Sequence, residues 1–539
     1  MSMTCGEATM RLLARYGVTT VFGVPGVHTL DLCRGMSDGE KPGAIRHVQA
    51  RNEQGAGFMA EGWARATGEV GVAVVISGPG VTNAATALGQ CHADSLPMLL
   101  ISAEPDSRTL GKGWGVLHEI TEQRAVTAPL TAFSATARRA SDVPELLARA
   151  FATFSGRRPR PVHISLPTDV QAEVVTGEWQ VDPPPAPAAR PVHMSRDIVA
   201  AAELLRSAAH PVLMVGGGSA GAADDLTAIA ETLGAIVVCS NAGKGVVADD
   251  HPLSLAASLG RPMVRETVSR ADVILAVGTE LSETDSFIER LDLRARLVRV
   301  DIDAAKIGDL YPPEIGIHAD AGPAMAALRA ELEGHVAPDR AGVQAEVARL
   351  RGDIVAGFTP SEQRHLRLLT LLGRIAPPGT IYAADSCQQA YTGSFALPVR
   401  APRHWLYPAG FCALGNALPN AIGAKLAKPG APVVVLTGDG GVMFTVQELV
   451  TAAELGLNLP VIIWENGGLK QIQDDMDIRG ITRVGVGGIN PDFVTLARAC
   501  HCAGETADDA RAFEAAFAAA LDADRPTVIV LREGRGWLA

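Results

Sequence analysis

Short apolar runs alternate along most of the chain with longer stretches in which apolar residues recur at helical spacing. The runs VGVAVVIS at 70–77 and MLLIS at 98–102 are bounded by Gly, Ser or Pro turns and followed by helical patterns. Fully apolar strands that alternate with amphipathic helices are typical of parallel sheets covered by helices on both faces. The pattern therefore predicts an α/β fold built on parallel sheets.

Two breaks interrupt this alternation. The segment DPPPAPAARP at 182–191 is rich in proline, as linkers are, and the stretch around 338–360 is polar helix and turn without a strand. The chain has 539 residues, more than one hydrophobic core normally supports. We therefore expect three domains of parallel-sheet α/β type, over residues 1–175, 190–335 and 360–539.

Composition narrows the possible partners and locations. The formal net charge of -12 leaves no basic surplus for a nucleic-acid backbone. Eight cysteines lack the paired spacing of a zinc site or a disulfide framework. The first residues lack the apolar core of a signal peptide, and no apolar run approaches the roughly 20 residues of a membrane span. We expect a cytoplasmic protein that binds neither nucleic acid nor membrane.

The predicted middle domain opens with PVLMVGGGSAGA, a strand followed by glycines in G-x-G-x-x-G spacing at 216, 218 and 221. This spacing can bind a dinucleotide. The next strand, however, ends in Ser240 and Asn241, where a dinucleotide site places an acid for the ribose. A tight turn without a nucleotide is the favoured interpretation, and a dehydrogenase is not expected.

A candidate metal site follows from residues 433–466, which read as a buried strand, a glycine turn, an amphipathic helix and a second buried strand. Asp439 and Asn466 then stand at the carboxyl ends of parallel strands, where open α/β sheets bind ligands. Their oxygens suit Mg²⁺, and the glycines at 438, 440 and 441 let backbone N–H groups approach a phosphate. The alternative is a simple turn in which Asp439 caps a helix.

The 27-residue spacing from Asp439 to Asn466, together with four other segments, resembles thiamin-diphosphate enzymes of the acetohydroxyacid-synthase-like group. These segments are VFGVPG (21–26), RNEQGAGFMAEGWARATG (51–68), SGPGVTNA (77–84) and GNALPNAIGA (415–424). The resemblance implies pyrimidine-binding, central and pyrophosphate-binding domains in that order, with thiamin diphosphate and Mg²⁺ as cofactors. It also implies a homodimer at minimum, with a homotetramer as the common form, because the family builds its site from two subunits.

The resemblance also assigns roles to single residues. Glu53 matches the glutamate that hydrogen-bonds the cofactor's aminopyrimidine and so promotes loss of the thiazolium C2 proton; alternatively it is an acid favoured by a helix dipole. Leu414 matches the apolar residue that bends the cofactor, or is core, and the Cys412 carbonyl matches the acceptor for the 4' amino group. The implied magnesium ligands are Asp439, Asn466 and the Gly468 carbonyl. The other implied cofactor contacts are Pro79, Asn83, Ser386, Gln388, Gln389, Gly438, Gly440, Gly441 and Leu469.

Three further segments look most like 5-guanidino-2-oxopentanoate (2-ketoarginine) decarboxylases: GVPGVHTL (23–30), GKGWGVLHE (111–119) and the QDDM run at 473–476. Asp474 and Asp475 suit a guanidinium, or form a solvated acidic helix face. His28 and His118 match pocket positions from which a proton can be delivered, or are structural. The remaining pocket positions that the resemblance implies are Val27 and Gln471, the latter grouped with the catalytic residues.

The expected function follows from these resemblances. The segment VGTELSETD at 277–285 lacks the arginines with which the synthases bind flavin, so FAD is not expected. We expect thiamin-diphosphate- and Mg²⁺-dependent decarboxylation of a 2-oxo acid, namely 5-guanidino-2-oxopentanoate to 4-guanidinobutanal and CO₂, in arginine catabolism. The alternatives are an acetolactate-synthase-like carboligase that condenses 2-oxo acids, and a non-catalytic regulatory or nucleotide-binding protein.

Overall fold

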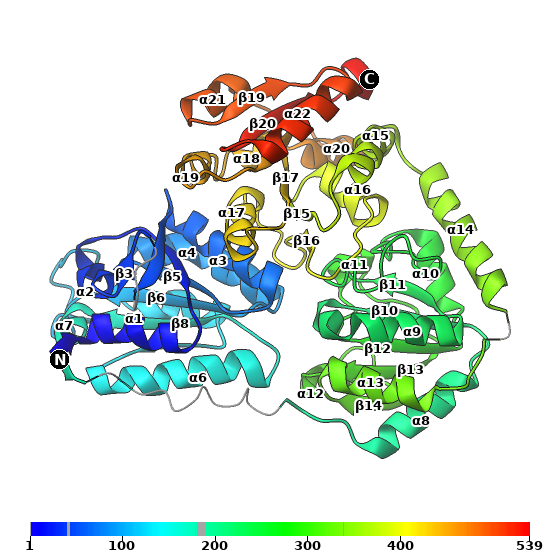
Figure 1. Ribbon diagram of the computed structural model, residues 1–539, viewed down its shortest axis with the longest axis horizontal. Coiled ribbons are helices and arrows are strands. Elements are labelled where there is room, and N and C mark those ends of the chain that lie inside the picture. The colour runs from blue at the N-terminus through cyan, green and yellow to red at the C-terminus, as the bar shows by residue number, and fades with distance from the viewer. Residues whose placement is uncertain (1, 40–43, 178, 180–189, 338) are drawn as a thin grey trace.

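The structure is a computed structural model that describes residues 2–39, 44–177, 179, 190–337 and 339–539. Three parallel sheets with flanking helices form an N-terminal body (blue to cyan), a central body (green) and a C-terminal body (yellow to red) (Figure 1). The predicted α/β fold of parallel-sheet type is confirmed. Residues 182–189 of the expected linker lie outside the described residues. Within the described ranges, no helix has the length and apolarity needed to cross a membrane.

The N-terminal body contains a seven-stranded sheet in the order β3-β4-β2-β5-β6-β8-β7, in which every pair is parallel. Its strands are β2 (Thr20–Gly23), β3 (Met36–Ser37), β4 (Ile45–Gln49), β5 (Gly71–Val75), β6 (Met98–Glu104), β7 (Phe133–Thr136) and β8 (Val162–Pro167). Its helices are α1 (Cys5–Arg15), η1 (Val27–Thr29), α2 (Leu30–Cys33), α3 (Glu53–Thr67), α4 (Pro79–Ala93), α5 (Gln123–Thr127), η2 (Ala128–Leu130), η3 (Ala140–Asp142), α6 (Val143–Gly156) and α7 (Thr168–Ala172). A short antiparallel pair joins β1 (Ser2–Thr4) to β9 (Val174–Thr176).

The central body is a five-stranded parallel sheet in the order β11-β10-β12-β13-β14. Its strands are β10 (Pro211–Val215), β11 (Ile236–Cys239), β12 (Val273–Val277), β13 (Arg296–Asp301) and β14 (Ile315–His318). Its helices are α8 (Ser195–Arg206), η4 (Gly217–Ala222), α9 (Ala223–Leu233), α10 (Pro262–Ser269), α11 (Glu283–Ser286), α12 (Ala304–Ile307) and α13 (Ala321–Glu331).

The glycine turn of the central body uses its own backbone donors internally. The N–H groups of Gly216 and Gly218 donate to the carbonyls of Val277 and Gly278, at 3.0 and 3.1 Å. Donors that are already paired are not free to receive a dinucleotide phosphate, so the turn packs β10 against the loop after β12. This geometry favours the tight-turn interpretation of the G-x-G-x-x-G spacing.

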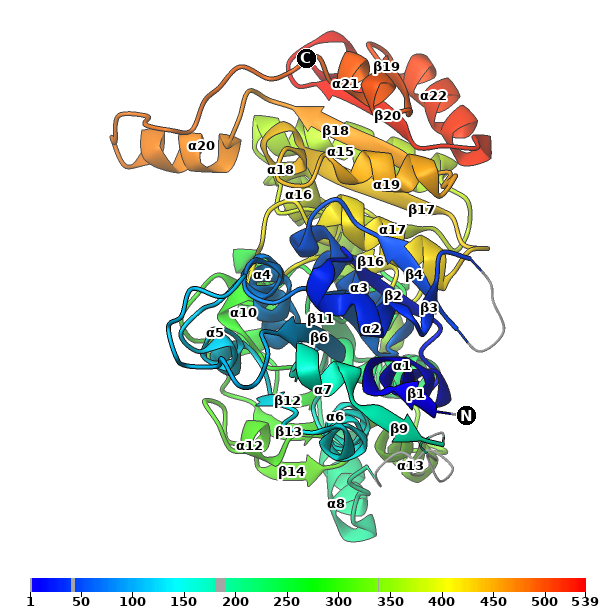
Figure 2. The same ribbon diagram turned by 90° about the vertical axis from the view of Figure 1, so that its left-hand side faces the viewer.

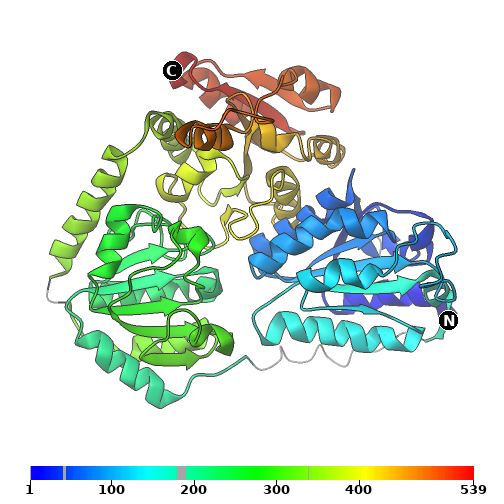
Figure 3. The same ribbon diagram turned by 180° about the vertical axis from the view of Figure 1, so that it is seen from behind.

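The C-terminal body is a six-stranded parallel sheet in the order β16-β15-β17-β18-β20-β19. Its strands are β15 (Ile381–Ala384), β16 (Trp405–Leu406), β17 (Val433–Gly438), β18 (Pro460–Glu465), β19 (Ala503–Thr506) and β20 (Thr527–Arg532). Its helices are α15 (Pro360–Ile375), α16 (Gln388–Ala396), α17 (Ala417–Ala427), α18 (Asp439–Val442), α19 (Glu448–Glu454), α20 (Lys470–Ile478), α21 (Phe493–Ala499), α22 (Ala510–Asp522) and η5 (Gly536–Leu538). Helix α14 (Arg340–Ala356) runs along the outside from the central body to this one (Figure 3).

Helices α3 and α17 pack against each other and join the N-terminal and C-terminal bodies (Figure 1). A Cβ added to Gly62 would lie 2.1 Å from the Asn420 carbonyl oxygen, and one added to Gly423 would lie 1.9 Å from that of Met59. Glycine at these two positions is what lets the helix backbones touch. One buried hydrophobic cluster contains residues of both bodies, so the two sheets share a core.

Candidate functional site

Asp439 stands at the end of β17, is 1% exposed, and is the first residue of α18. Its Oδ2 accepts hydrogen bonds from four N–H groups: the backbones of Asn466 (3.1 Å), Gly467 (2.7 Å) and Gly468 (3.2 Å) and the Asn490 side chain (2.8 Å). Oδ1 accepts one bond from its own helix, from Gly440 N at 2.9 Å, so most of the bonds to this carboxylate come from the turn after β18 and the N-cap of α18 is Gly438. The strand-end convergence predicted for Asp439 and Asn466 is present.

Three oxygens face one another at this point. The Asn466 carboxamide oxygen is directed at Asp439 Oδ1 and at the Gly468 carbonyl oxygen, and exchanging the amide oxygen and nitrogen would place a donor 3.3 Å from each. Neighbouring oxygens around Mg²⁺ lie about 3 Å apart, because the ion holds them octahedrally at about 2.1 Å. With its oxygen on this side, the carboxamide can add a third oxygen beside the carboxylate and the carbonyl, and the exchanged orientation would instead donate to both. The donor set of one carboxylate, one amide and one carbonyl fits Mg²⁺. A cluster of three or more His, Cys, Asp or Glu, which other metals would use, is absent from the described residues.

The predicted diphosphate contacts gather around this turn. Gly438, Gly440 and Gly441 span the β17–α18 junction, and Leu469 precedes α20. Gln389 Nε2 donates to the Thr437 carbonyl at 2.9 Å. The Oε1 atoms of Gln388 and Gln389 are buried and have no hydrogen-bond partner among the described residues, so two acceptors remain for donors of a ligand or water.

Asp385 is a residue that sequence reasoning missed. It follows β15, is 1% exposed, and accepts bonds from Gly415 N (3.0 and 3.1 Å), Ser386 N (2.8 Å) and Thr437 Oγ1 (3.0 Å). Burial raises the pKa of this carboxyl to about 6. Its position at a strand end was the available signal, since the same rule predicted Asp439. It ties Ser386 to the loop that carries Cys412 and Leu414.

Cys412 and Leu414 lie in the loop between β16 and α17. Cys412 has a left-handed φ of 56°, and its Sγ lies 2.9 Å from Ser386 Oγ. Leu414 is partly exposed, so it is not a plain core residue. The loop is thus held at the carboxyl end of β15 by contacts from Asp385 and Ser386, which follow that strand.

At the N-terminal sheet, Glu53 opens α3 and is 8% exposed. The cap of α3 is Asn52, whose side chain accepts a bond from Gln54 N at 2.9 Å. Glu53 Oε2 instead accepts a bond from Asn83 Nδ2, also at 2.9 Å. Asn83 is on α4, which begins at Pro79, so two predicted cofactor contacts belong to one helix beside Glu53.

His28 and His118, 90 positions apart in the sequence, are brought together by the fold. Their ring centroids lie 5.2 Å apart in an edge-to-face arrangement. His28 Nδ1 lies 2.5 Å from Ser77 Oγ, and burial, followed by the neighbouring His118, lowers the pKa of His28. A hydroxyl that donates to Nδ1 leaves the proton of a neutral imidazole on Nε2. Val27 precedes this pair and is 62% exposed.

Helix α20 projects from the C-terminal body, on the same side as α5 of the N-terminal body (Figure 2). Asp474 forms an ion pair with Lys470 and accepts a bond from Gln388 Nε2 at 3.0 Å. Asp475 Oδ1 accepts a bond from Gln471 Nε2 at 3.3 Å, and no described lysine, arginine or histidine pairs with it. The predicted substrate residues on α20 therefore adjoin Gln388, whereas no hydrogen bond or ion pair between described residues joins them to His28 or His118.

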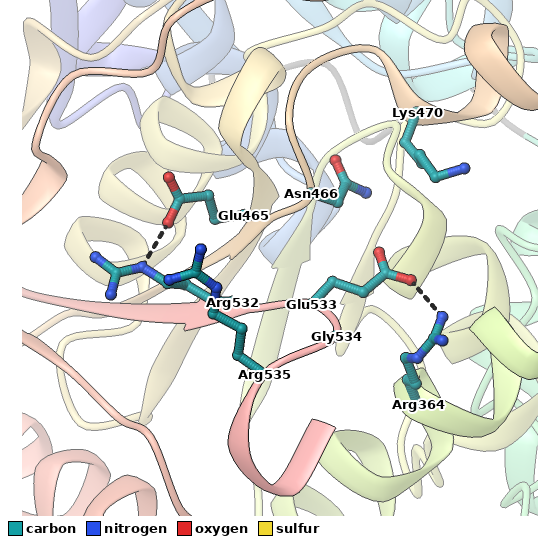
Figure 4. A pocket seen from close by; sticks show the side chains of 8 residues that line it. All are labelled: Arg364, Glu465, Asn466, Lys470, Arg532, Glu533, Gly534 and Arg535. Carbon is teal, nitrogen blue, oxygen red and sulfur yellow. Dashed lines mark hydrogen bonds and ion pairs between the residues drawn. The ribbon is translucent and has the colours of Figure 1, made fainter. Parts of the chain in front are cut away.

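A cavity of about 610 Å³ opens beside Asn466 and Lys470, and sequence reasoning did not identify it (Figure 4). Glu465 pairs with Arg532 and Glu533 with Arg364, each at 3.1 Å. The remaining lining includes Gly534 and Arg535. Its charged side chains come from α15, the end of β18, the start of α20, and the end of β20 with the residues that follow it. These segments meet only because β18 and β20 are neighbours in the sheet.

Comparison with known proteins agrees with this geometry. Three family profiles match the chain: "Thiamine pyrophosphate enzyme, N-terminal TPP binding domain" over residues 3–126, "central domain" over 198–328 and "C-terminal TPP binding domain" over 386–531. These matches fall on the three bodies described above, in the same order; β7 and β8 lie beyond the first match, and β15 lies before the last.

Three curated relatives span most of the chain. The "Probable 2-ketoarginine decarboxylase AruI" of Pseudomonas aeruginosa is 48% identical over 536 residues, which cover 98% of this chain and 94% of that protein. An acetolactate synthase of Mycobacterium bovis is 31% identical over 93% of this chain and 83% of its own length. The acetolactate synthase isozyme 1 large subunit of Escherichia coli is 30% identical over 88% and 84%. The chain therefore belongs to the thiamin-diphosphate enzyme family, and thiamin diphosphate is its cofactor.

Proposed function

We propose that the chain decarboxylates 5-guanidino-2-oxopentanoate to 4-guanidinobutanal and CO₂, with thiamin diphosphate held through Mg²⁺. The observation that carries this proposal is the 48% identity, over nearly the whole length, to a relative named for 2-ketoarginine decarboxylation. Asp475 pairs with no described lysine, arginine or histidine, and it lies next to Asp474, which accepts a bond from Gln388. A carboxylate without a cationic partner supports a cationic substrate. Bound thiamin diphosphate would supply an electron sink for the carbon–carbon cleavage.

The metal and diphosphate would be held at the C-terminal sheet. Asp439, Asn466 and the Gly468 carbonyl would bind Mg²⁺ through the three oxygens that face one another. The other contacts that we assign to the cofactor are Pro79, Asn83, Ser386, Gln388, Gln389, Cys412 (through its carbonyl), Leu414, Gly438, Gly440, Gly441 and Leu469. This assignment is supported by the position of these residues at or beside the carboxyl ends of parallel strands.

Glu53 would hold a proton for the ring nitrogen of the cofactor's pyrimidine. Asn83 already donates to Oε2, which leaves Oε1 free to face the cofactor. A carboxyl that is 8% exposed is screened from bulk water, so its hydrogen bond to a ring nitrogen would be stronger than in solution.

His28 and His118 would deliver the proton that the product needs after CO₂ leaves. The Ser77 contact at Nδ1 supports a donor at His28 Nε2, and His118 is within ring contact of it. Gln471 would act at the same pocket, together with Val27. Asp475 and Asp474 would receive the guanidinium, because two carboxylates can accept its parallel N–H donors.

We also propose a homodimer at minimum, assembled further into a homotetramer. Large apolar side chains are exposed beside both candidate half-sites: Val27 (62%), Trp114 (65%), Leu117 (57%), Phe411 (50%), Met443 (44%) and Phe444 (51%). Exposed apolar groups gathered beside a site mark a surface that association buries. Sedimentation analysis would test this, and a monomer at micromolar concentration with full activity would contradict it.

Domain limits at residues 1–175, 190–335 and 360–539 are part of the same proposal and follow the spacing of the three sheets. A cytoplasmic location is supported by the eight cysteines, all of which are free thiols and so compatible with a reducing compartment.

A substrate panel tests the activity. Purified protein with thiamin diphosphate and Mg²⁺ should release CO₂ and form 4-guanidinobutanal from 5-guanidino-2-oxopentanoate, with far lower turnover of pyruvate. Acetolactate formed from pyruvate at a comparable rate would favour the carboligase alternative, which the acetolactate synthase relatives at 30–31% identity keep open.

A further inference from the structure

A buried glutamine lies beneath the loop that carries the histidine pair. Gln123 is the first residue of α5 and is 3% exposed. Its Oε1 accepts a bond from the Gly78 backbone N–H at 2.8 Å. Its Nε2 lies within bonding distance of three oxygens: the Ala103 carbonyl (2.8 Å), Ser102 Oγ (3.0 Å) and Ser165 Oγ (3.0 Å). One side chain thus joins the Gly78 loop to two strands of the sheet.

Gly78 is the contact point between this glutamine and the two histidines. Its backbone has φ 59° and ψ −105°, a conformation open to glycine, and an added Cβ would lie 2.5 Å from the His118 carbonyl oxygen. The preceding residue, Ser77, bonds His28 Nδ1 at 2.5 Å. A bond that holds the Gly78 N–H therefore fixes the residue that lies against His118. Through the adjacent Ser77, it also fixes the hydrogen-bond partner of His28.

The network ends in a histidine that has no direct contact with the candidate site. His163 is fully buried, with Nε2 2.8 Å from Ser102 Oγ and Nδ1 2.7 Å from Thr127 Oγ1. Burial lowers the pKa of His163 to about 3, so the ring stays neutral wherever the enzyme works. A neutral ring with a hydroxyl at each nitrogen therefore holds Ser102 and Thr127 in the same way at any working pH.

We propose that Gln123 is a positioning residue that holds Ser77 and Gly78 so that His28 and His118 keep the geometry needed to deliver a proton. The proposal rests on the proposed function of the two histidines. Gln123 acts through the backbone of Gly78 and touches neither substrate nor cofactor. Without its Oε1, the Gly78 N–H has no acceptor from this network, and the 77–79 segment is free to turn Ser77 Oγ away from His28.

Two substitutions at position 123 separate positioning from packing. Gln123→Met keeps the volume and removes the acceptor for Gly78 N–H. Gln123→Glu keeps that acceptor, and its second oxygen can carry a proton toward Ala103 because burial favours the neutral acid. Thr127→Val is the matched control, because it perturbs the same buried network at His163 and leaves the Gln123–Gly78 bond in place.

The first measurement uses the protein without cofactor. Amide hydrogen–deuterium exchange at Ser77 and Gly78 should accelerate at least about tenfold in Gln123→Met, and the NMR titration of His28 should move. Thr127→Val and Gln123→Glu should resemble the unmodified protein. Unchanged exchange and an unchanged His28 titration in Gln123→Met would overturn the proposal, as would equal changes in Gln123→Met and Thr127→Val.

The second measurement uses the holoenzyme. Gln123→Met should lower kcat about tenfold, shift the pH profile, and change KM and cofactor affinity less than twofold, whereas Gln123→Glu should recover most of kcat. Loss confined to thermal stability, with an unaltered pH profile, would overturn the positioning role. If no 2-oxo acid is decarboxylated at all, the proposed function fails. The exchange experiment needs no substrate, so it still tests whether Gln123 holds Ser77 and Gly78 in place.

Discussion

At the end of β17, four backbone N–H groups and one side-chain amide hold the Asp439 carboxylate. At the N-terminal sheet, side chains hold side chains: Asn83 bonds Glu53, and Ser77 bonds His28. The first arrangement fixes the position of a carboxylate through the fold of the chain. The second leaves titratable groups whose proton affinity their neighbours can tune, as the lowered pKa of His28 illustrates.

This difference matches the two tasks of a cofactor enzyme. Holding a metal and a diphosphate needs oxygens and N–H groups at fixed positions, which backbone at strand ends provides. Moving protons needs groups that change charge, which only side chains provide. Substitutions at the two half-sites should therefore fail in different ways, one in binding and the other in turnover.

The largest effect is expected at Glu53. Glu53→Gln should lower kcat by a factor of about 10² to 10⁴, because a glutamine can still accept the Asn83 bond but carries no transferable proton. Cofactor affinity, measured by fluorescence titration, should stay nearly unchanged. The exposed Glu69→Gln provides the control with normal turnover. Full activity in Glu53→Gln would contradict the assigned role.

Asp439→Asn should show the opposite pattern, with binding lost first. Cofactor affinity in the presence of Mg²⁺ should fall about 100-fold, since charge-assisted hydrogen bonds contribute about 1.5–3 kcal/mol and tenfold in affinity corresponds to about 1.4 kcal/mol. Raising Mg²⁺ and cofactor should restore part of the turnover. The exposed helix cap Asp492 provides the control, and Asp492→Asn should bind normally. Equal cofactor affinities in both variants would rule out a metal ligand at Asp439.

The contact between helices α3 and α17 joins the N-terminal and C-terminal bodies, and it can be weakened without replacing any residue assigned to the site. Gly423→Ala should destabilise the fold by about 1–3 kcal/mol, because its Cβ would lie 1.9 Å from the Met59 carbonyl oxygen of the facing helix. Gly352→Ala, on exposed α14 with nothing within 4 Å of its Cβ, should instead stabilise by about 0.5–1 kcal/mol. Denaturant unfolding would measure both; a neutral Gly423→Ala would show that the helices can separate freely.

Asp475 allows a smaller test of substrate recognition. Asp475→Asn should raise KM for 5-guanidino-2-oxopentanoate about fivefold, since a partly exposed ion pair contributes up to about 1 kcal/mol. Turnover of a 2-oxo acid whose side chain carries no charge should not change. Asp477→Asn is the matched control, because Asp477 on the same helix already pairs with Arg483. A KM change of equal size in both variants would indicate a general effect of helix charge.

The sequence predicted those parts of the site that follow from local order. Asp439 and Asn466 could be placed together because each ends a strand, and parallel strands bring their carboxyl ends to one edge. Asp385 satisfies the same rule but lacks a glycine motif that would have singled it out. The 610 Å³ cavity and the Gln123 network could not be predicted, because they depend on which strands are neighbours and on hydrogen bonds between distant segments.

The smallest shift concerns the histidine pair and is read from the pKa of His28, separately from any loss of turnover caused by replacing His118. Both burial and the charge of His118 lower the pKa of His28. His118→Asn removes the second cause and keeps the first, so the pKa of His28 should rise but remain below its ordinary value. The limb of the kcat/KM profile that belongs to His28 should then move to higher pH, and NMR titration of His28 should move with it. A shift to lower pH, or none, would mean that the two rings do not sense each other, and the side-chain half of the site would lose its tunable pair.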